Sequence, residues 1–272
     1  MISYRLLAAL LGAVALTSCG DRNAAQEISA PIAGSAVKFF HFGVNAPAVN
    51  FYADNTKLSG TSSTSCSDAV TGSTTDATCL STGKEPTTGT GYGVAANGGG
   101  LYASVAPGSH TLSGRITATT DNGLAVSNTP ATFENGKFYS YYLSGIYNTT
   151  AKTVEGFVVE DPLPAFDYTK AYVRFVNAVS NSQPMTLYAK ETTSGVEGPV
   201  GPQVAYKAAG TFVAVPSGIY DLSTRVAGSS SNVITRTGVS FSANRVYTIS
   251  SRGDITATTG TNTPALDNTA NR

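Results

Sequence analysis

Short stretches in which apolar and polar residues alternate recur along the chain and predict β-strands. Residues 111–117 (Thr-Leu-Ser-Gly-Arg-Ile-Thr) and 219–226 (Ile-Tyr-Asp-Leu-Ser-Thr-Arg-Val) are two of them. A period of two places successive side chains on opposite faces, as in a half-buried strand. Pro-Gly at 107–108 and Pro-Ser-Gly at 216–218 precede the two stretches. These residues favour tight turns, because Pro fixes φ and Gly accepts a positive φ. We therefore expect an all-β protein.

The pattern occurs twice. Three blocks recur in the same order, with offsets of 136, 110 and 108 residues: Val37–Ala53 with Val173–Ala189, Val105–Arg115 with Val215–Arg225, and Phe133–Tyr139 with Phe241–Tyr247. The fall from 136 to 110 means that the first copy carries 26 additional residues, within 55–101. Internal repeats of this kind indicate two copies of one fold in tandem.

Each copy is predicted to be a β-sandwich, since short strands are separated by turns about every 8–12 residues. Asn135-Gly136 and Ala243-Asn244 are interpreted as hairpin turns. The expected organisation is a signal peptide (1–18), a lipidated cysteine and tether (19–35), a first sandwich (36–160) with an insertion (55–101), a linker (161–171), a second sandwich (172–255) and a disordered tail (256–272).

The first twenty residues predict export and lipidation. Arg5 precedes an apolar run from Leu6 to Leu16, and Leu16-Thr-Ser-Cys19 follows the lipobox pattern of an aliphatic residue, two small residues and cysteine. The run is too short to cross a bilayer, which takes about 20 residues as a helix. We expect cleavage before Cys19 and a diacylglyceryl group on its thiol. Gly20 supplies no acidic retention signal, so the outer membrane is favoured where the source has two membranes.

Composition fits an extracytoplasmic β-protein and argues against a highly charged partner such as nucleic acid. Lys+Arg and Asp+Glu both number 17, and charged residues make up only 12% of the chain, so no field of one sign attracts nucleic acid. Of the three cysteines, lipidation uses Cys19 and leaves Cys66 and Cys79, 13 positions apart. We predict that these two form a disulfide in an oxidising compartment, worth about 3 kcal/mol. A metal site is the weaker alternative, because two thiolates lack further ligands nearby.

The repeated blocks also resemble a known family. The stretch from Val37 to Tyr52, followed by Val-Ala-Pro-Gly-Ser-His-Thr-Leu at 105–112, is similar to the bacterial domain of unknown function 4397. The resemblance extends over about residues 36–254 and is clearer in the first copy. It implies an exported, often lipid-anchored protein built from paired immunoglobulin-like (Ig-like) β-domains. The resemblance therefore leads us to expect two tandem Ig-like β-sandwiches. The family has no assigned catalytic residues, so none is carried over.

Nothing in the sequence predicts catalysis, a cofactor or a metal. His41 and His110 align with Asn177 and Tyr220 in the second copy, and such a change of chemistry favours a structural role. No Gly-x-Ser-x-Gly, His-Glu-x-x-His or phosphate-loop motif is present. A glycan hydrolase would need two carboxylates about 5–10 Å apart, and nothing in the spacing pairs the available acids: Glu134, Glu155, Glu160 and Asp161. Asp68 and Asp76 are too few for calcium.

Two features suggest a binding surface. Arg252-Gly253-Asp254 copies a tripeptide that integrins recognise, but is interpreted as a turn at a strand end. In the strand-like stretch from Phe138 to Leu143, Tyr139, Tyr141 and Leu143 are expected to face the core, which turns Phe138 and Tyr142 outward. An exposed aromatic pair could stack on a sugar ring. The alternative is that the neighbouring sandwich or the insertion covers both, since large exposed apolar patches are uncommon.

The leading hypothesis is therefore a non-catalytic, lipid-anchored protein of the cell envelope that presents a binding or adhesive surface, with a glycan as one candidate ligand. Long loops on a rigid sandwich are a common way to build such a surface. The alternative is an assembly protein that docks to another envelope component. A glycan-acting hydrolase is the least favoured class.

Overall fold

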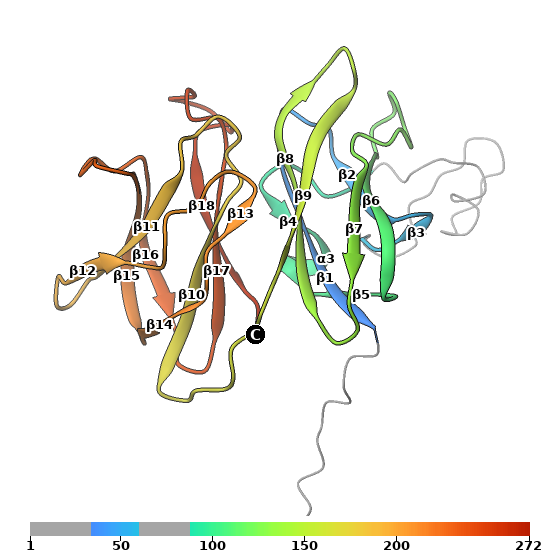
Figure 1. Cartoon of the computed structure of the whole chain (residues 1–272). Coiled ribbons are helices and arrows are strands. Elements are labelled where there is room, and N and C mark those ends of the chain that lie inside the picture. Colours follow the sequence, from blue (N-terminus) through green and yellow to red (C-terminus); the bar gives the residue numbers. More distant parts are fainter. Residues whose placement is uncertain (1–33, 60–87) are drawn as a thin grey trace, which may run out of the picture. The chain divides into compact units, whose positions relative to one another are not determined.

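A computed structural model describes residues 34–59 and 88–272 (Figure 1). Cys19, Cys66 and Cys79 lie outside the described residues, as do the predicted signal peptide, most of the tether and the central part of the insertion. In the described ranges, no helix combines the length and apolar character that a membrane span requires. Within the described residues the one helical segment is short, α3 (Ala96–Gly100), and the other regular elements there are β-strands, as predicted.

The first repeat is a β-sandwich of two sheets. One sheet has the order β4-β1-β8-β9, with β5 also paired to β1, and the other has the order β3-β2-β6-β7. The strands are β1 (Ser35–Val44), β2 (Val49–Ala53), β3 (Thr56–Lys57), β4 (Val94–Ala95), β5 (Ala103–Val105), β6 (Gly108–Ile116), β7 (Thr129–Phe133), β8 (Phe138–Asn148) and β9 (Thr153–Glu160).

The second repeat has the same arrangement. Its sheets have the orders β13-β10-β17-β18, with β14 also paired to β10, and β12-β11-β15-β16. The strands are β10 (Lys170–Asn177), β11 (Met185–Glu191), β12 (Glu197–Pro199), β13 (Ala208–Ala209), β14 (Val213–Pro216), β15 (Gly218–Val226), β16 (Ile234–Phe241), β17 (Val246–Arg252) and β18 (Ala265–Ala270). Two tandem β-sandwiches are thus confirmed, whereas the Ig-like label stays a prediction.

The duplication extends to the strand register. In the first sandwich β1 runs parallel to β8 with Lys38 opposite Ser140. In the second, β10 runs parallel to β17 with Arg174 opposite Thr248. These are the positions that the sequence offsets of 136 and 108 relate. The two copies therefore place equivalent residues at equivalent points of the fold.

Each sandwich has its own apolar core. In the first, Tyr139, Tyr141 and Leu143 of β8 pack into the core as predicted, together with Phe39 of β1 and Phe51 of β2. In the second, the core gathers eighteen buried residues, among them Phe175, Leu187 and Ile249 at the corresponding places. Alternation along β8 and β17 is what directs these side chains inward.

The hairpin predictions at 135–136 and 243–244 were wrong. The turn at Asn135-Gly136 joins β7 to β8, which belong to different sheets, and Ala243-Asn244 likewise joins β16 to β17. Gly136 has a positive φ of 76° and Asn244 one of 61°, so both turns need residues that accept the left-handed region. The turn chemistry was recognised, but it serves a corner between sheets and not a hairpin.

The tail at 256–272 is not disordered. Residues 265–270 form β18, which pairs antiparallel with β17 from Arg252↔Ala265 to Tyr247↔Ala270. Leu266 is buried in the second core. This strand lies where β9 lies beside β8 in the first sandwich. The polar composition that suggested disorder belongs to a strand in which three residues are half-buried, two are buried and one is exposed.

A third apolar cluster joins the two sandwiches. Phe40, Phe42 and Tyr142 of the first sandwich pack against Val176 and Ala178 of the second. Phe40 and Val176 are equivalent positions in the duplicated pattern, as are Phe42 and Ala178. The two copies thus bury the same part of the sheet against each other, with larger side chains on the first copy.

Candidate functional site

The aromatic pair proposed as an exposed site, Phe138 and Tyr142, does not form one. Tyr142 is fully buried. Its ring stacks on Phe40 at 4.6 Å between centroids and on Phe157 at 5.1 Å, and its hydroxyl lies 3.0 Å from Ser250 Oγ. Because the second sandwich covers it, Tyr142 is a packing residue.

Phe138 is half-buried and does not extend a surface patch. Its ring meets the edge of Tyr102 at 5.0 Å between centroids. Contacts with neighbouring segments thus cover Tyr142 fully and Phe138 in part, which was the alternative left open by the sequence. The prediction of an exposed aromatic site on this strand is wrong.

A buried ionic group lies beside these aromatic residues. The Arg174 guanidinium pairs with the Asp161 carboxylate, and both side chains are at most 1% exposed. Arg174 also donates to the Glu160 carbonyl oxygen (2.8 Å) and to Thr248 Oγ1 (3.0 Å). The second Asp161 oxygen accepts from Tyr102 Oη (2.7 Å) and Ser140 Oγ (2.8 Å). A buried pair with all of these groups satisfied holds the linker residue Asp161 in one place.

Lys38, which occupies the position of Arg174 in the first copy, is also buried. Its ammonium donates to the Ala270 carbonyl oxygen at the end of β18 and lies 4.5 Å from the centre of the Tyr102 ring. Burial lowers the pKa of Lys38 to about 8, although the nearby Asp161 carboxylate acts in the opposite direction. The group therefore has the buried, hydrogen-bonded character of a structural cation.

We expect the lowered pKa of Lys38 to make stability rise with pH. Between about pH 8 and 10.5 the unfolded chain binds more protons at this residue than the folded chain does, so the free energy of unfolding increases with pH. From pH 8 to 9.5, below the titration of ordinary tyrosines, the gain from Lys38 is about 1.5 kcal/mol. Urea unfolding at several pH values should show this slope in the natural protein and lose it in Lys38→Met. An unchanged slope in the variant would contradict the assignment.

The Arg252-Gly253-Asp254 sequence forms a turn at the end of β17, as predicted. Arg252 pairs with Asp267 of β18 at 2.5 Å and lies over the Tyr92 ring. Gly253 has a φ of 113°, and a Cβ there would lie 2.8 Å from the Asn262 carbonyl oxygen, so glycine is required. These contacts give the tripeptide a structural role.

The remaining candidate catalytic groups are held by structural contacts. His41 is buried, with Nε2 2.8 Å from the Pro47 carbonyl oxygen, and burial lowers the pKa of its ring. Each acid considered for hydrolysis has a cationic partner: Glu134 and Glu160 with Lys137, Glu155 with Lys207, and Asp161 with Arg174. Across residues 34–59 and 88–272, no cluster of three or more His, Cys, Asp or Glu side chains could hold a metal ion.

His110 and Tyr220, aligned by the sequence, have equivalent surroundings. His110 Nε2 lies 2.9 Å from the Ala106 carbonyl oxygen, and the Tyr220 hydroxyl donates to the Pro216 carbonyl oxygen at the same distance. Each of these contacts is to the carbonyl oxygen four residues earlier in the chain. They lie at the corner where the chain passes from one sheet of the sandwich to the other. Both rings also pack on a core phenylalanine: His110 is stacked on Phe133, and Tyr220 is tilted against Phe241.

A cleft opens at this corner in each sandwich. In the first it has a volume of about 220 Å³ and is lined by Ala53, Asp54, Thr56, Leu58, Ser104, Val105, Ala106 and His110. His110 Nδ1 lies 2.8 Å from Asp54 Oδ2. The Thr111 backbone N–H and the His110 ring hold the pKa of the Asp54 carboxyl below its ordinary value. Both ring nitrogens of His110 therefore have hydrogen-bond partners within the protein.

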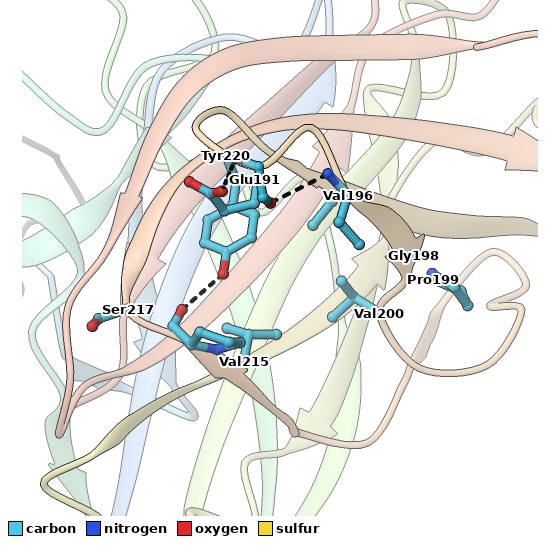
Figure 2. Close-up of a pocket in the computed structure, with 11 residues that line it drawn as sticks. Glu191, Val196, Gly198, Pro199, Val200, Val215, Ser217 and Tyr220 are labelled. Carbon is cyan, nitrogen blue, oxygen red and sulfur yellow. Dashed lines mark hydrogen bonds between the residues drawn. The ribbon is translucent and has the colours of Figure 1, made fainter.

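In the second sandwich the cleft is larger, about 460 Å³ (Figure 2). Its residues are mostly apolar: Ala189, Val196, Gly198, Pro199, Val200, Val215, Pro216 and Tyr220, with Glu191, Ser194 and Ser217 as the polar ones. Figure 2 shows Tyr220 and Glu191 on one side and the β12 residues Gly198 and Pro199 on the other. Backbone N–H groups of Thr193 and Ser194 bind the carboxylate and lower the pKa of Glu191 to about 2.

Sequence reasoning did not find these clefts. The alignment paired Ala53 with Ala189, Val105 with Val215 and His110 with Tyr220, which are the residues that line both. It carried no sign of a cavity, because the space depends on how the corner of one sheet meets the edge of the other. Glu191 and Glu197–Pro199 lie outside the aligned blocks.

Comparison with known proteins identifies the family. The model of the domain of unknown function DUF4397 matches residues 35–188 and 171–271. The chain belongs to this family. Together the two matches span both sandwiches of this DUF4397 protein, including β18 at its end. No curated protein matches the chain.

Proposed function

We propose that this DUF4397 protein is a non-catalytic binding module of the bacterial cell envelope, anchored by lipid on Cys19. The observation that carries the binding role is the cleft repeated at the same corner of both sandwiches. A duplicated fold that keeps a concave, partly apolar site in each copy has the form of a binding protein, because small-molecule sites are concave and mainly apolar. Buried contacts such as Arg174–Asp161 fix the copies together, which gives the sites a rigid scaffold.

The proposed location in the cell envelope rests on the residues before 20. The basic start, the short apolar run and the lipobox ending at Cys19 favour export and acylation, and each buried methylene of the acyl chains adds about 0.8 kcal/mol of membrane affinity. Lipid on this cysteine in the outer membrane, together with an oxidised Cys66–Cys79 pair, completes the proposal. A glycan ligand has lost its supporting observation, since Tyr142 is buried.

The first test is Cys19→Ser. We expect the natural protein to sediment with the membrane fraction and the variant to be recovered almost entirely in the soluble fraction, because no acyl chain remains. Fractionation followed by immunoblotting measures the distribution. A Cys19→Ser protein that still sediments and resists extraction with salt would contradict the lipid anchor.

The same variant tests the binding role. Soluble Cys19→Ser protein, added to envelopes isolated from the cells that produce it, should bind saturably. Heat-unfolded protein is the control for non-specific adsorption. If protease treatment of the envelopes abolishes binding, the partner is a protein and the assembly role is favoured. The absence of saturable binding would contradict both roles.

A further inference from the structure

The cleft of the second sandwich is an open, apolar site of ligand size. Val196, Val200 and Val215 contribute aliphatic walls, and Pro199 and Pro216 add rigid apolar surface. Val196 is 69% exposed, which is unusual for an aliphatic side chain that lines a concavity. A volume of about 460 Å³ falls within the range of small-molecule sites, about 300–1,000 Å³.

One carboxylate lines this cleft and has no cation. The Thr193 backbone N–H donates to Glu191 Oε1 at 2.9 Å, and the Ser194 N–H donates to Oε2. Together with hydrogen bonds from the Ser194 and Thr193 side chains, these bonds hold the carboxylate in its ionised form at the edge of the cleft. In the part of the chain that the structure describes, no lysine, arginine or histidine forms an ion pair with Glu191.

The first sandwich supplies the contrast. There the cleft carboxylate, Asp54, has the His110 ring at 2.8 Å, and the cleft is about half as large. In the second sandwich the residue at the position of His110 is Tyr220, whose hydroxyl donates to the Pro216 carbonyl oxygen instead. The first cleft thus has an imidazole beside its carboxylate, whereas the corresponding ring of the second cleft, Tyr220, is directed to a backbone oxygen.

We propose that the cleft of the second sandwich binds an apolar organic cation, with the apolar part between β12 and Tyr220 and an ammonium group at Glu191. This assignment rests on the proposed binding role and names its ligand class. An apolar group gains from leaving water, and the ammonium gains a fixed anionic partner at the edge of the site. Neutral ligands of the same shape gain the first contribution alone, and anions are repelled.

Three probes of one shape test the ligand class: 2-phenylethylammonium, 2-phenylethanol and phenylacetate. Calorimetric titration uses the mature chain with Cys19→Ser, which retains every described residue. We expect saturable binding of the cation, about two- to fivefold tighter than binding of the alcohol, as an exposed charge pair provides. Phenylacetate should bind most weakly, and added salt should reduce the difference between the cation and the alcohol.

Two variants locate the site. Gly198 lines the cleft, does not have a positive φ, and has no atom within 4 Å of an added Cβ, so Gly198→Phe should fold normally and fill the space. We expect it to abolish binding of all three probes. Glu191→Gln should weaken the cation to the level of the alcohol and leave the alcohol unchanged. Glu134→Gln, which makes the same change at an exposed carboxylate outside both clefts, is the matched control and should not change cation binding.

Equal affinities for the three probes, no saturable binding, or cation binding that survives Gly198→Phe in a protein with a natural circular dichroism spectrum would each overturn the proposal. The envelope test separates this failure from failure of the proposed function. Envelope binding that Gly198→Phe leaves unchanged would keep the binding role and refute the cleft as its site. Cation binding without envelope binding would keep the cleft as a cation site and refute the proposed envelope-binding role.

Discussion

Asp161→Ala is expected to destabilise the protein by about 3–5 kcal/mol, because it leaves the Arg174 guanidinium buried without its charge partner. Both side chains are at most 1% exposed, so water cannot replace the lost carboxylate without opening the contact between the sandwiches. Tyr102 and Ser140 lose their acceptor as well. Chemical denaturation followed by circular dichroism measures the change in the free energy of unfolding.

The double variant Asp161→Ala/Arg174→Met separates the ion pair from simple loss of packing. Removing both charges should recover about 2 kcal/mol or more relative to Asp161→Ala, since an apolar replacement of a buried pair is often close to neutral. Lys152→Ala is the control, because its pair with Asp121 is exposed and should contribute no measurable stability. A double variant as unstable as the single one would show that the unpaired charge is not the cause.

Tyr142→Ala is expected to have an effect of similar size, about 3–5 kcal/mol, which is typical of truncating a large buried side chain. The ring stacks on Phe40 and Phe157, and its loss opens a cavity in the cluster that both sandwiches share. Because that cluster joins the two copies, we also expect their unfolding transitions to separate. Thermal and urea unfolding followed by circular dichroism report both effects.

Tyr142→Phe and Tyr168→Ala provide the comparison. The first keeps the ring and removes the hydroxyl near Ser250, so it should reduce stability by about 1 kcal/mol. The second removes an aromatic ring that is 78% exposed and should change stability little. If Tyr142→Ala were as stable as the natural protein, the ring would be exposed, and the original hypothesis of an aromatic binding surface would regain its support.

Local pattern predicted the strands well but not their partners. Alternation placed Tyr139, Tyr141 and Leu143 in the core, since the period of two depends on the backbone alone. The same alternation turned Tyr142 away from that core without indicating that the second sandwich covers it. The turns at 135–136 and 243–244 illustrate the same limit, because a glycine or asparagine that accepts a positive φ suits a corner as well as a hairpin.

The tail shows how composition misled. Residues 256–272 have few large apolar side chains, and no repeated block extended into them. The sandwich nevertheless needs a strand beside β17, as β9 lies beside β8, and β18 occupies that place with Leu266 as its buried apolar residue. Pairing with β17 satisfies the backbone groups of β18 that face it. A stretch of weak hydrophobicity gains these hydrogen bonds only in the folded protein.

The sequence by itself determined the all-β class, the duplication and the equivalence of positions such as Lys38 and Arg174 or His110 and Tyr220, because these depend on local periodicity and on comparison of the chain with itself. Only the tertiary structure decided that Lys38 and Arg174 are buried between the copies, that Tyr142 is covered, and that the two corners are hollow. Those properties arise from residues distant in sequence, such as Asp161 near Arg174 and Ala270 near Lys38. Burial and cavities depend on which surfaces meet, and that is settled only when both sandwiches have formed and packed.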